Sequence, residues 1–146
     1  MRKRRPEVGV YALLLHVPRK TTIAVGRLGS LEFVPGVYVY IGSALNSLPG
    51  RVARHFRQAK RTHWHIDYLV GDPSVRLLSF AVRPTSRKIE CAMSRAIQRS
   101  AVISTDRFGS SDCNCDSHLH RFAKFLDASE VLCQHRFQFR PRGDLG

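Results

Sequence analysis

Two apolar runs, residues 8–17 and 37–41, constrain the fold of this chain more than any other feature of its sequence. Both runs are rich in β-branched and aromatic residues, the composition that favours buried strands. The residues between them, 18–36, contain two shorter apolar segments around a glycine-containing turn, which predicts a hairpin arm. We therefore expect two neighbouring strands of one sheet, with the hairpin projecting between them.

The rest of the chain predicts helices and strands in a single α/β domain of the α+β kind. We expect a helix over residues 49–60 with Ser47 as its N-cap, a strand over 75–83, a helix over 86–98, a short helix over 121–128 and a final strand over 131–140. Residues 63–69 fit either a strand or a helix, and residues 104–120 are loop-like. A chain of 146 residues is long enough to bury one ordinary core.

Positive charge is concentrated in the first half of the chain. The formal net charge is +13, and residues 1–66 contribute +10 of it, because they hold twelve Lys and Arg against two acids. Such a surface suits a polyanion, since neutralised phosphates release their counterions. No basic amphipathic helix with a Trp or Leu face is evident, which favours nucleic acid over a membrane. Without a long apolar run or a signal-peptide core, we expect a cytoplasmic protein.

Each apolar run carries a tyrosine in a short glycine-containing word, Gly-Val-Tyr ending at Tyr11 and Tyr-Ile-Gly beginning at Tyr40. On neighbouring strands the two phenols can point the same way and orient a water, although each also fits a core aromatic with a hydrated tip. Arg51 follows where a loop enters a helix, so its guanidinium and the positive helix end can converge on a phosphate. His55 shares its helix face. The alternative is a row of Arg side chains that solvate an exposed face.

Glu90 is the one acid between Asp72 and Asp106. Its place early in the second predicted helix suits a single-metal ligand for Mg²⁺, which keeps several of its waters. A carboxylate there equally satisfies the positive end of the helix dipole.

An alternating set, His63, His65 and Asp67, lies outside this series. On a strand the three side chains would share one face, with the apolar neighbours inward, and could bind nucleic acid or a metal. On a helix this arrangement is lost.

Residues 113–120 offer four metal ligands within eight positions, Cys113, Cys115, His118 and His120, whose types suit Zn²⁺. The Cys-x-Cys spacing is tighter than usual, and such a loop also packs without a metal. The four cysteines of the chain are too few and too unevenly spaced for a disulfide framework, so we expect reduced thiols.

The ordered series of the two words, Leu48, Arg51, His55 and a helical Glu90 resembles the GIY-YIG nuclease superfamily over roughly residues 8–98. The segments 63–69 and 108–119 extend the resemblance to an uncharacterised branch whose members are sometimes fused to endonuclease III-type repair enzymes. The resemblance implies a small three-stranded central sheet flanked by helices. The 18–36 hairpin is then an insertion, because 28 residues separate the two tyrosines, and residues 99–146 form a Cys/His-containing extension.

The resemblance further implies a one-metal endonuclease acting on DNA, in preference to RNA, with a role and a protein partner in repair. Glu90 would ligate Mg²⁺ or Mn²⁺, Tyr11 would help activate water, Tyr40 would hydrogen-bond at the site, Arg51 would stabilise the pentacovalent phosphate and His55 would support proton transfer. The polar and basic side chains expected to contact nucleic acid are Ser43, Arg54, Arg57, Lys60, Arg61, His63 and His65. Two alternatives stay open: an inactive nucleic-acid-binding module on the same scaffold, and a zinc-stabilised interaction domain.

Overall fold

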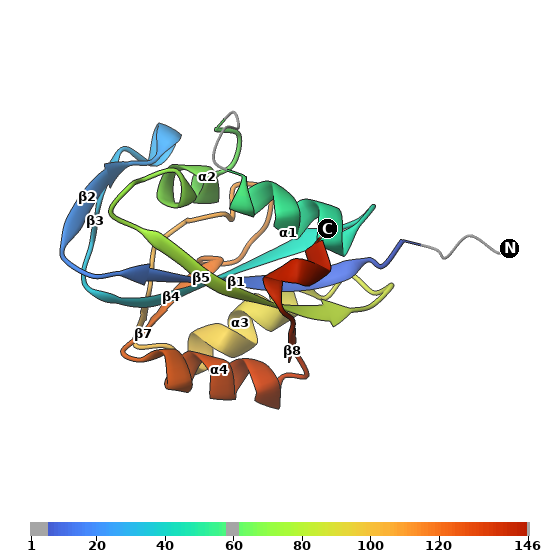
Figure 1. The fold of residues 1–146 in the computed structure, drawn as a ribbon. Coiled ribbons are helices and arrows are strands. Elements are labelled where there is room, and N and C mark those ends of the chain that lie inside the picture. The colour runs from blue at the N-terminus through green and yellow to red at the C-terminus, as the bar shows by residue number, and fades with distance from the viewer. Residues whose placement is uncertain (1–5, 58–61, 146) are drawn as a thin grey trace, which may run out of the picture.

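The protein is an α+β domain in which a six-stranded antiparallel sheet runs between two pairs of helices (Figure 1). The computed structural model describes residues 6–57 and 62–145. The strands in these ranges are β1 (Gly9–Val17), β2 (Thr21–Ala24), β3 (Ser30–Phe33), β4 (Gly36–Ala44), β5 (Arg76–Pro84), β6 (Ile103–Ser104), β7 (Leu119–Phe122) and β8 (Gln138–Phe139). The helices are α1 (Leu48–Phe56), α2 (His65–Val70), α3 (Glu90–Ser100) and α4 (Phe125–Gln134).

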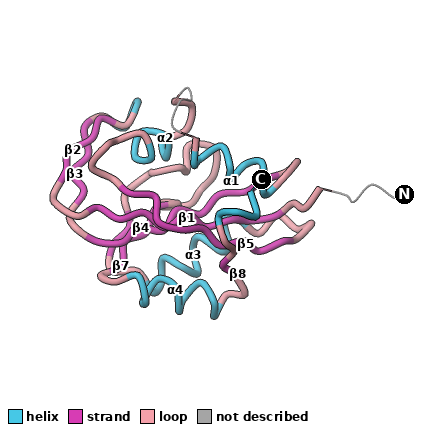
Figure 2. Tube along the Cα trace, viewed as in Figure 1, coloured by secondary structure: helices cyan, strands magenta, loops and turns pink. Residues whose placement is uncertain are grey.

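The centre of the sheet is made by the three long strands that the sequence predicts. The spatial order is β6-β7-β4-β1-β5-β8, and β1 pairs along its whole length with β4. Within this ladder Tyr11 lies opposite Gly42, and Leu13 lies opposite Tyr40. The β2–β3 hairpin forms a separate two-stranded arm, which confirms the predicted excursion between the two apolar runs (Figure 2).

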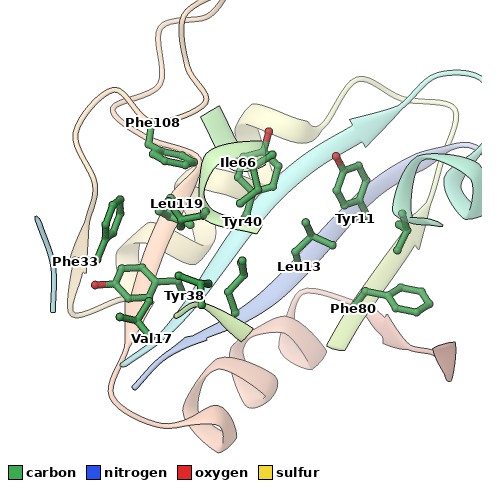
Figure 3. Packing of buried hydrophobic residues seen from close by; sticks show 14 of the residues in the cluster. Tyr11, Leu13, Val17, Phe33, Tyr38, Tyr40, Ile66, Phe80, Phe108 and Leu119 are labelled. Atoms are coloured by element: carbon green, nitrogen blue, oxygen red, sulfur yellow. The ribbon is translucent and has the colours of Figure 1, made fainter. Parts of the chain in front are cut away.

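Alternation along β1 divides the core into two layers, because successive strand side chains point to opposite faces. Tyr11, Leu13 and Leu15 pack toward the face covered by α1, α2 and the hairpin arm. Val10, Ala12 and Leu14 pack toward the face covered by α3 and α4. Tyr40 belongs to the first layer, so both tyrosines of the two words lie on the α1/α2 side of the sheet (Figure 3).

The expectation of a three-stranded sheet was wrong in strand number, because three short strands extend the sheet at its two edges. The predicted helix at 121–128 and strand at 131–140 were also wrong: residues 119–122 form β7, and α4 occupies residues 125–134. Ala128 and Leu132 are the buried residues of α4 and lie four positions apart, which is the spacing of one helix face. The final strand shrinks to the two residues of β8.

The pairing of β4 with β7 ends beside the Tyr-Ile-Gly motif, and the candidate site lies at this end of the ladder. The β4–β7 ladder ends at Tyr40, and one further backbone bond joins Ile41 N–H to the carbonyl of His118. The long loop of residues 105–118 contains no helix or strand and folds over this end of β4 (Figure 2). Phe108 anchors the loop, since its side chain is fully buried and its ring contacts those of Phe33 and Tyr40.

Candidate active site

Residues from six parts of the fold converge on one polar pocket of about 270 Å³. Its walls are formed by β1, β4, the first turn of α1, the segment leading into α2, the start of α3 and the loop before β7. The lining side chains that the sequence predicts are Tyr11, Tyr40, Ser43, Arg51, His63, His65 and Glu90. The pocket therefore brings together the two phenols, the guanidinium and the carboxylate of the predicted series.

Tyr11 is held against β4 by the glycine that closes the second word. A Cβ atom on Gly42 would come within 2.5 Å of both Cζ and the hydroxyl of Tyr11, so only a glycine fits under this ring. The Tyr11 hydroxyl lies 2.8 Å from Nε2 of His55, which is fully buried on α1. Burial raises the pKa of Tyr11, the Arg51 charge lowers it and the Glu90 charge raises it, with burial dominant. The phenol is therefore protonated at neutral pH.

His55 lies behind Tyr11 rather than in the pocket. It lines a separate cavity of about 470 Å³, together with Arg57 and Arg142, that contains no other member of the predicted catalytic series. His55 thus reaches the pocket through its contact with the Tyr11 hydroxyl.

Arg51 enters the pocket from the first turns of α1, whose start is fixed by the predicted cap: the Ser47 hydroxyl accepts a hydrogen bond from Gly50 N–H at 3.1 Å. The Arg51 guanidinium stacks over the Trp64 ring at 4.6 Å. Its Nη1 is 3.4 Å from the Ser43 carbonyl, which is long for a hydrogen bond. Stacking fixes the plane of the guanidinium and keeps its N–H edge available to an anion.

Arg54 has a different neighbour. Its two terminal nitrogens donate to the Asp67 carboxylate at 2.9 and 3.0 Å, and its guanidinium covers the Trp64 ring at 4.1 Å. Asp67 Oδ2 also accepts the backbone N–H groups of His63 and Trp64 at the start of α2. Burial opposes the charge of Asp67, but Arg54 and the two N–H groups outweigh it and hold its pKa below the ordinary value.

The strand alternative for residues 63–69 was wrong, because α2 begins at His65. Asp67 turns inward to Arg54, whereas His65 accepts a hydrogen bond at Nδ1 from the N–H of Gly109, 2.9 Å away. Burial lowers the pKa of His65. His63 is exposed at the pocket edge. Arg57 is exposed at the end of α1, and the predicted nucleic-acid contacts Lys60 and Arg61 lie outside the described residues.

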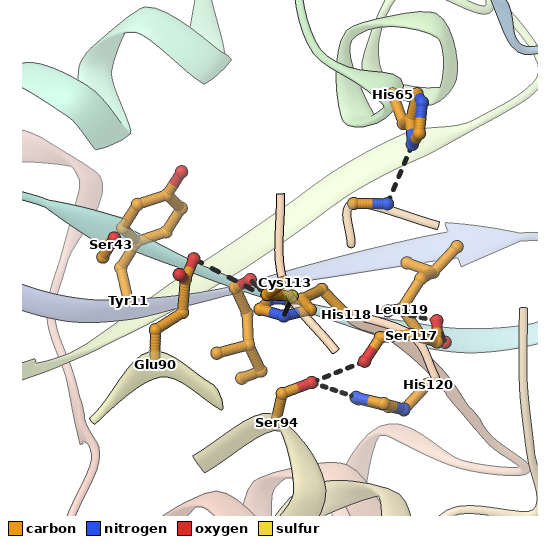
Figure 4. A network of polar contacts seen from close by, with 12 residues as sticks. Tyr11, Ser43, His65, Glu90, Ser94, Cys113, Ser117, His118, Leu119 and His120 are labelled. Atoms are coloured by element: carbon orange, nitrogen blue, oxygen red, sulfur yellow. Dashed lines mark hydrogen bonds and ion pairs between the residues drawn. The ribbon is translucent and has the colours of Figure 1, made fainter. Parts of the chain in front are cut away.

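Glu90 is the first residue of α3, and its side chain is 33% exposed to solvent. The carboxylate lies on the side of Ser43 and Tyr11 (Figure 4). One carboxylate oxygen is 3.7 Å from Nδ1 of His118. Burial is the largest influence on its pKa and raises it; the Asp112 charge raises it further, while His118, Ser43 and Arg51 lower it without reversing the shift. A desolvated carboxylate beside a second one is a site that gains from a cation.

The Cys/His cluster differs in membership from the sequence expectation. Cys91, Cys113, Cys115 and His118 place one ligand atom each within 4.8 Å of one another, so the group can hold a metal such as zinc. His120 lies apart, with its ring nitrogens 2.8 Å from the Ser94 hydroxyl and 2.6 Å from the Ser104 hydroxyl. The fourth member of the group is therefore Cys91, next to Glu90.

Three residues of this region were not predicted from the sequence to belong to the site: Trp64, Asp112 and Cys91. The guanidinium groups of Arg51 and Arg54 both stack on the Trp64 ring. An aromatic residue close in sequence to several arginines is a usable signal for such stacking. Asp112 lines the pocket beside the predicted zinc loop. Cys91 is far from Cys113 in sequence, so only the packing of α3 against the loop reveals it.

Comparison with known proteins gives a family but no activity. A family model described as a domain of unknown function, DUF123, matches residues 10–138. No curated protein and no solved structure matches the chain at a significant level. None of the helices in the described ranges has the length and apolar character that crossing a bilayer requires.

Proposed function

The chain belongs to the DUF123 family, and we propose that it is a divalent-metal-dependent endonuclease that hydrolyses phosphodiester bonds in DNA on a GIY-YIG nuclease-like scaffold. One observation carries the proposal: Tyr11, Tyr40, Arg51 and Glu90, from β1, β4, α1 and α3, line a single pocket. Two phenols, a guanidinium and a carboxylate are together the groups that orient a nucleophilic water, neutralise a phosphate and bind a hard cation.

Arg51 is the phosphate ligand of this proposal. Because its guanidinium is stacked on Trp64, the planar fork is preorganised, and little side-chain entropy is lost when it binds an anion. The first turns of α1 add their positive end on the same side. Arg51 would stabilise the negative charge that grows on the phosphoryl oxygens in the transition state.

Tyr11 and His55 form the proton pathway. A protonated phenol is a poor base, but its oxygen can accept a hydrogen bond from a water in the pocket while its own proton faces His55 Nε2 at 2.8 Å. As the water attacks the phosphorus, its proton moves to the Tyr11 oxygen and the phenol proton moves to His55. The bond from phosphorus to the leaving oxygen breaks, and that oxygen departs with the electron pair and takes a proton from solvent. This relay needs the His55 tautomer that leaves Nε2 unprotonated.

Glu90 is the metal ligand, and the donors around it fit Mg²⁺ or Mn²⁺. The pocket offers oxygen atoms from Glu90, Asp112 and Ser43, the hard donors that these ions prefer alongside their own waters. A bound ion would polarise a phosphoryl oxygen and lower the pKa of a coordinated water. Tyr40, buried beside Tyr11 with ring centroids 6.4 Å apart, keeps the Tyr11 ring in place.

The surface around the pocket suits a nucleic-acid strand. A neighbouring hollow of about 720 Å³ shares His63 and His65 with the pocket and adds the exposed Arg27 and Arg107. A phosphodiester backbone that crosses the pocket would continue along these side chains. The net charge of +13 favours such a partner, and the resemblance favours DNA and a task in repair.

Nicking and cleavage assays test the proposal. Supercoiled plasmid and labelled branched, single-stranded and damaged oligonucleotides are incubated with Mg²⁺, Mn²⁺ or chelator. We expect metal-dependent cutting that falls by about 100-fold or more in Arg51→Ala and in Glu90→Gln. The matched controls are Arg99→Ala and Glu130→Gln, which change exposed charges outside the pocket.

Cutting that survives both pocket substitutions would reject the assigned site. Salt-sensitive DNA binding without any metal-dependent cutting, retained in Glu90→Gln, would favour the inactive binding module instead.

A further inference from the structure

The group of Cys91, Cys113, Cys115 and His118 joins helix α3 to the loop before β7, which Ser94 of α3 also contacts through the Ser117 carbonyl. Cys91 is the second residue of α3, and the other three ligands belong to the loop before β7. This loop contains no regular secondary structure, and it forms one wall of the candidate active site through Gly109, Ser111 and Asp112.

We propose that these four side chains bind a structural zinc ion, and that the ion fixes the distance between the two acidic walls of the active site. Each acid of the pocket is the immediate sequence neighbour of a zinc ligand: Glu90 precedes Cys91, and Asp112 precedes Cys113. The zinc site stands on its own geometry, and only its link to catalysis rests on the proposed nuclease function.

The ligand geometry fits zinc. Three thiols and one imidazole are a common structural set for this ion. A tetrahedron with Zn–S of about 2.3 Å and Zn–N of about 2.0–2.1 Å separates sulfur from nitrogen by about 3.6 Å. The distance between Cys113 Sγ and His118 Nε2 is 3.5 Å. A disulfide would use two of the thiols and would leave the third thiol and the imidazole unexplained.

His118 is oriented as a ligand before any metal binds. Its Nδ1 lies 3.0 Å from the Ile41 carbonyl, closer than the 3.7 Å to Glu90, so the ring donates its proton to the carbonyl and directs the Nε2 lone pair toward the cluster. Its backbone is fixed too, since His118 N–H donates to Phe108 and its carbonyl accepts from Ile41 N–H. The ligand is thus tied to β4 next to Gly42.

Metal binding to the wild-type protein is the primary test. Protein purified under reducing conditions, stripped and reloaded, is expected to contain one zinc per chain by elemental analysis. Co²⁺ in place of zinc should give the intense visible bands of tetrahedral coordination and thiolate-to-cobalt charge-transfer bands. Cys91→Ser should lower zinc affinity by at least about 100-fold, more than the loss of an outer-shell partner costs. Cys133→Ser, an exposed cysteine on α4, should leave affinity unchanged.

Hydrogen exchange tests the structural consequence on the wild-type protein alone, with and without zinc. Removal of zinc should speed exchange in residues 105–118 and in the first turn of α3, and it should leave β1 unchanged. Three results would each overturn the inference. The first is a reloaded protein that contains no zinc, and the second is a disulfide between Cys113 and Cys115, or one that involves Cys91, in the reduced preparation. The third is hydrogen exchange that is the same with and without metal. A zinc-loaded protein that cuts no DNA would reject the proposed function alone, and an active enzyme without zinc would reject this inference alone.

Discussion

The tip of the Tyr11 side chain occupies the space that a Cβ atom would need on Gly42, its partner in the β1–β4 ladder. This contact gives a physical reason for the two short words of the sequence: the tyrosine of the first needs the glycine of the second. The hydroxyl then reaches His55 on α1, and Tyr11 shares the pocket with Glu90 of α3. The close approach of two strands thereby sets where a phenol stands in the site.

Gly42→Ala should displace Tyr11. The added Cβ would meet the tip of the ring at 2.5 Å, inside a well-packed layer, so the ring must move. We expect a loss of about 1–3 kcal/mol in the free energy of unfolding, the usual cost of overpacking. The rate of DNA cutting should also fall, even under conditions in which the variant stays folded. Gly143→Ala is the control, since nothing lies within 4 Å of its Cβ. A Gly42→Ala protein with full activity would contradict the placement of Tyr11.

Tyr11 and His55 should act as a coupled pair. Tyr11→Phe removes the hydroxyl and leaves buried His55 Nε2 without that bond, which costs about 1–3 kcal/mol of stability. Cutting should fall by about 10²–10⁴-fold, the range for a lost acid–base group. In a double-mutant cycle with His55→Gln, the second substitution should add little to the first. Fully additive rate effects would show that the two residues act separately.

Arg51→Lys should fail to rescue Arg51→Ala. A lysine keeps the charge but loses the planar fork that stacks on Trp64 and grips a phosphate at two points. Single-turnover rates on a DNA substrate should therefore stay close to those of the alanine variant, while DNA binding at low salt partly recovers. Recovery of the cutting rate itself would mean that Arg51 supplies charge only.

The central strands were predictable because their signal is local. Residues 8–17 and 37–41 are continuous apolar runs, and Ser47 with Pro49 marks the start of α1. The C-terminal elements were not, because β7 has four residues and follows a polar loop. In α4 the two buried residues, Ala128 and Leu132, are too few to outweigh the strand-like segment that follows them.

Several residues that line the pocket were predictable from the sequence, but their arrangement was not. Tyr11, Tyr40, Arg51 and Glu90 could be chosen from their order along the chain. The burial of His55, the pairing of Arg54 with Asp67 and the replacement of His120 by Cys91 in the metal cluster depend on how α1, α2 and α3 pack. Such contacts join residues far apart in sequence, and no periodicity encodes them.

The Arg54–Asp67 pair makes the stability of the domain depend on acidity in a defined direction. The pKa of Asp67 is lower in the folded protein than the ordinary value of about 3.9. Its carboxylate therefore contributes stability at every pH above the ordinary value, and that contribution disappears as the pH falls through the lowered pKa. Asp67→Asn should cost about 2–3 kcal/mol at pH 7, because it weakens a bidentate pair and two backbone contacts.

The measurement is urea unfolding followed by the fluorescence of Trp64, the one tryptophan, which lies against Arg54. The difference in unfolding free energy between wild type and Asp67→Asn should hold steady between about pH 7 and 5 and shrink below about pH 4. Glu130→Gln, at an exposed site on α4, should differ little from wild type throughout. A difference that stays constant down to pH 3, or grows, would mean that Asp67 is not the charged partner of Arg54 in the folded protein.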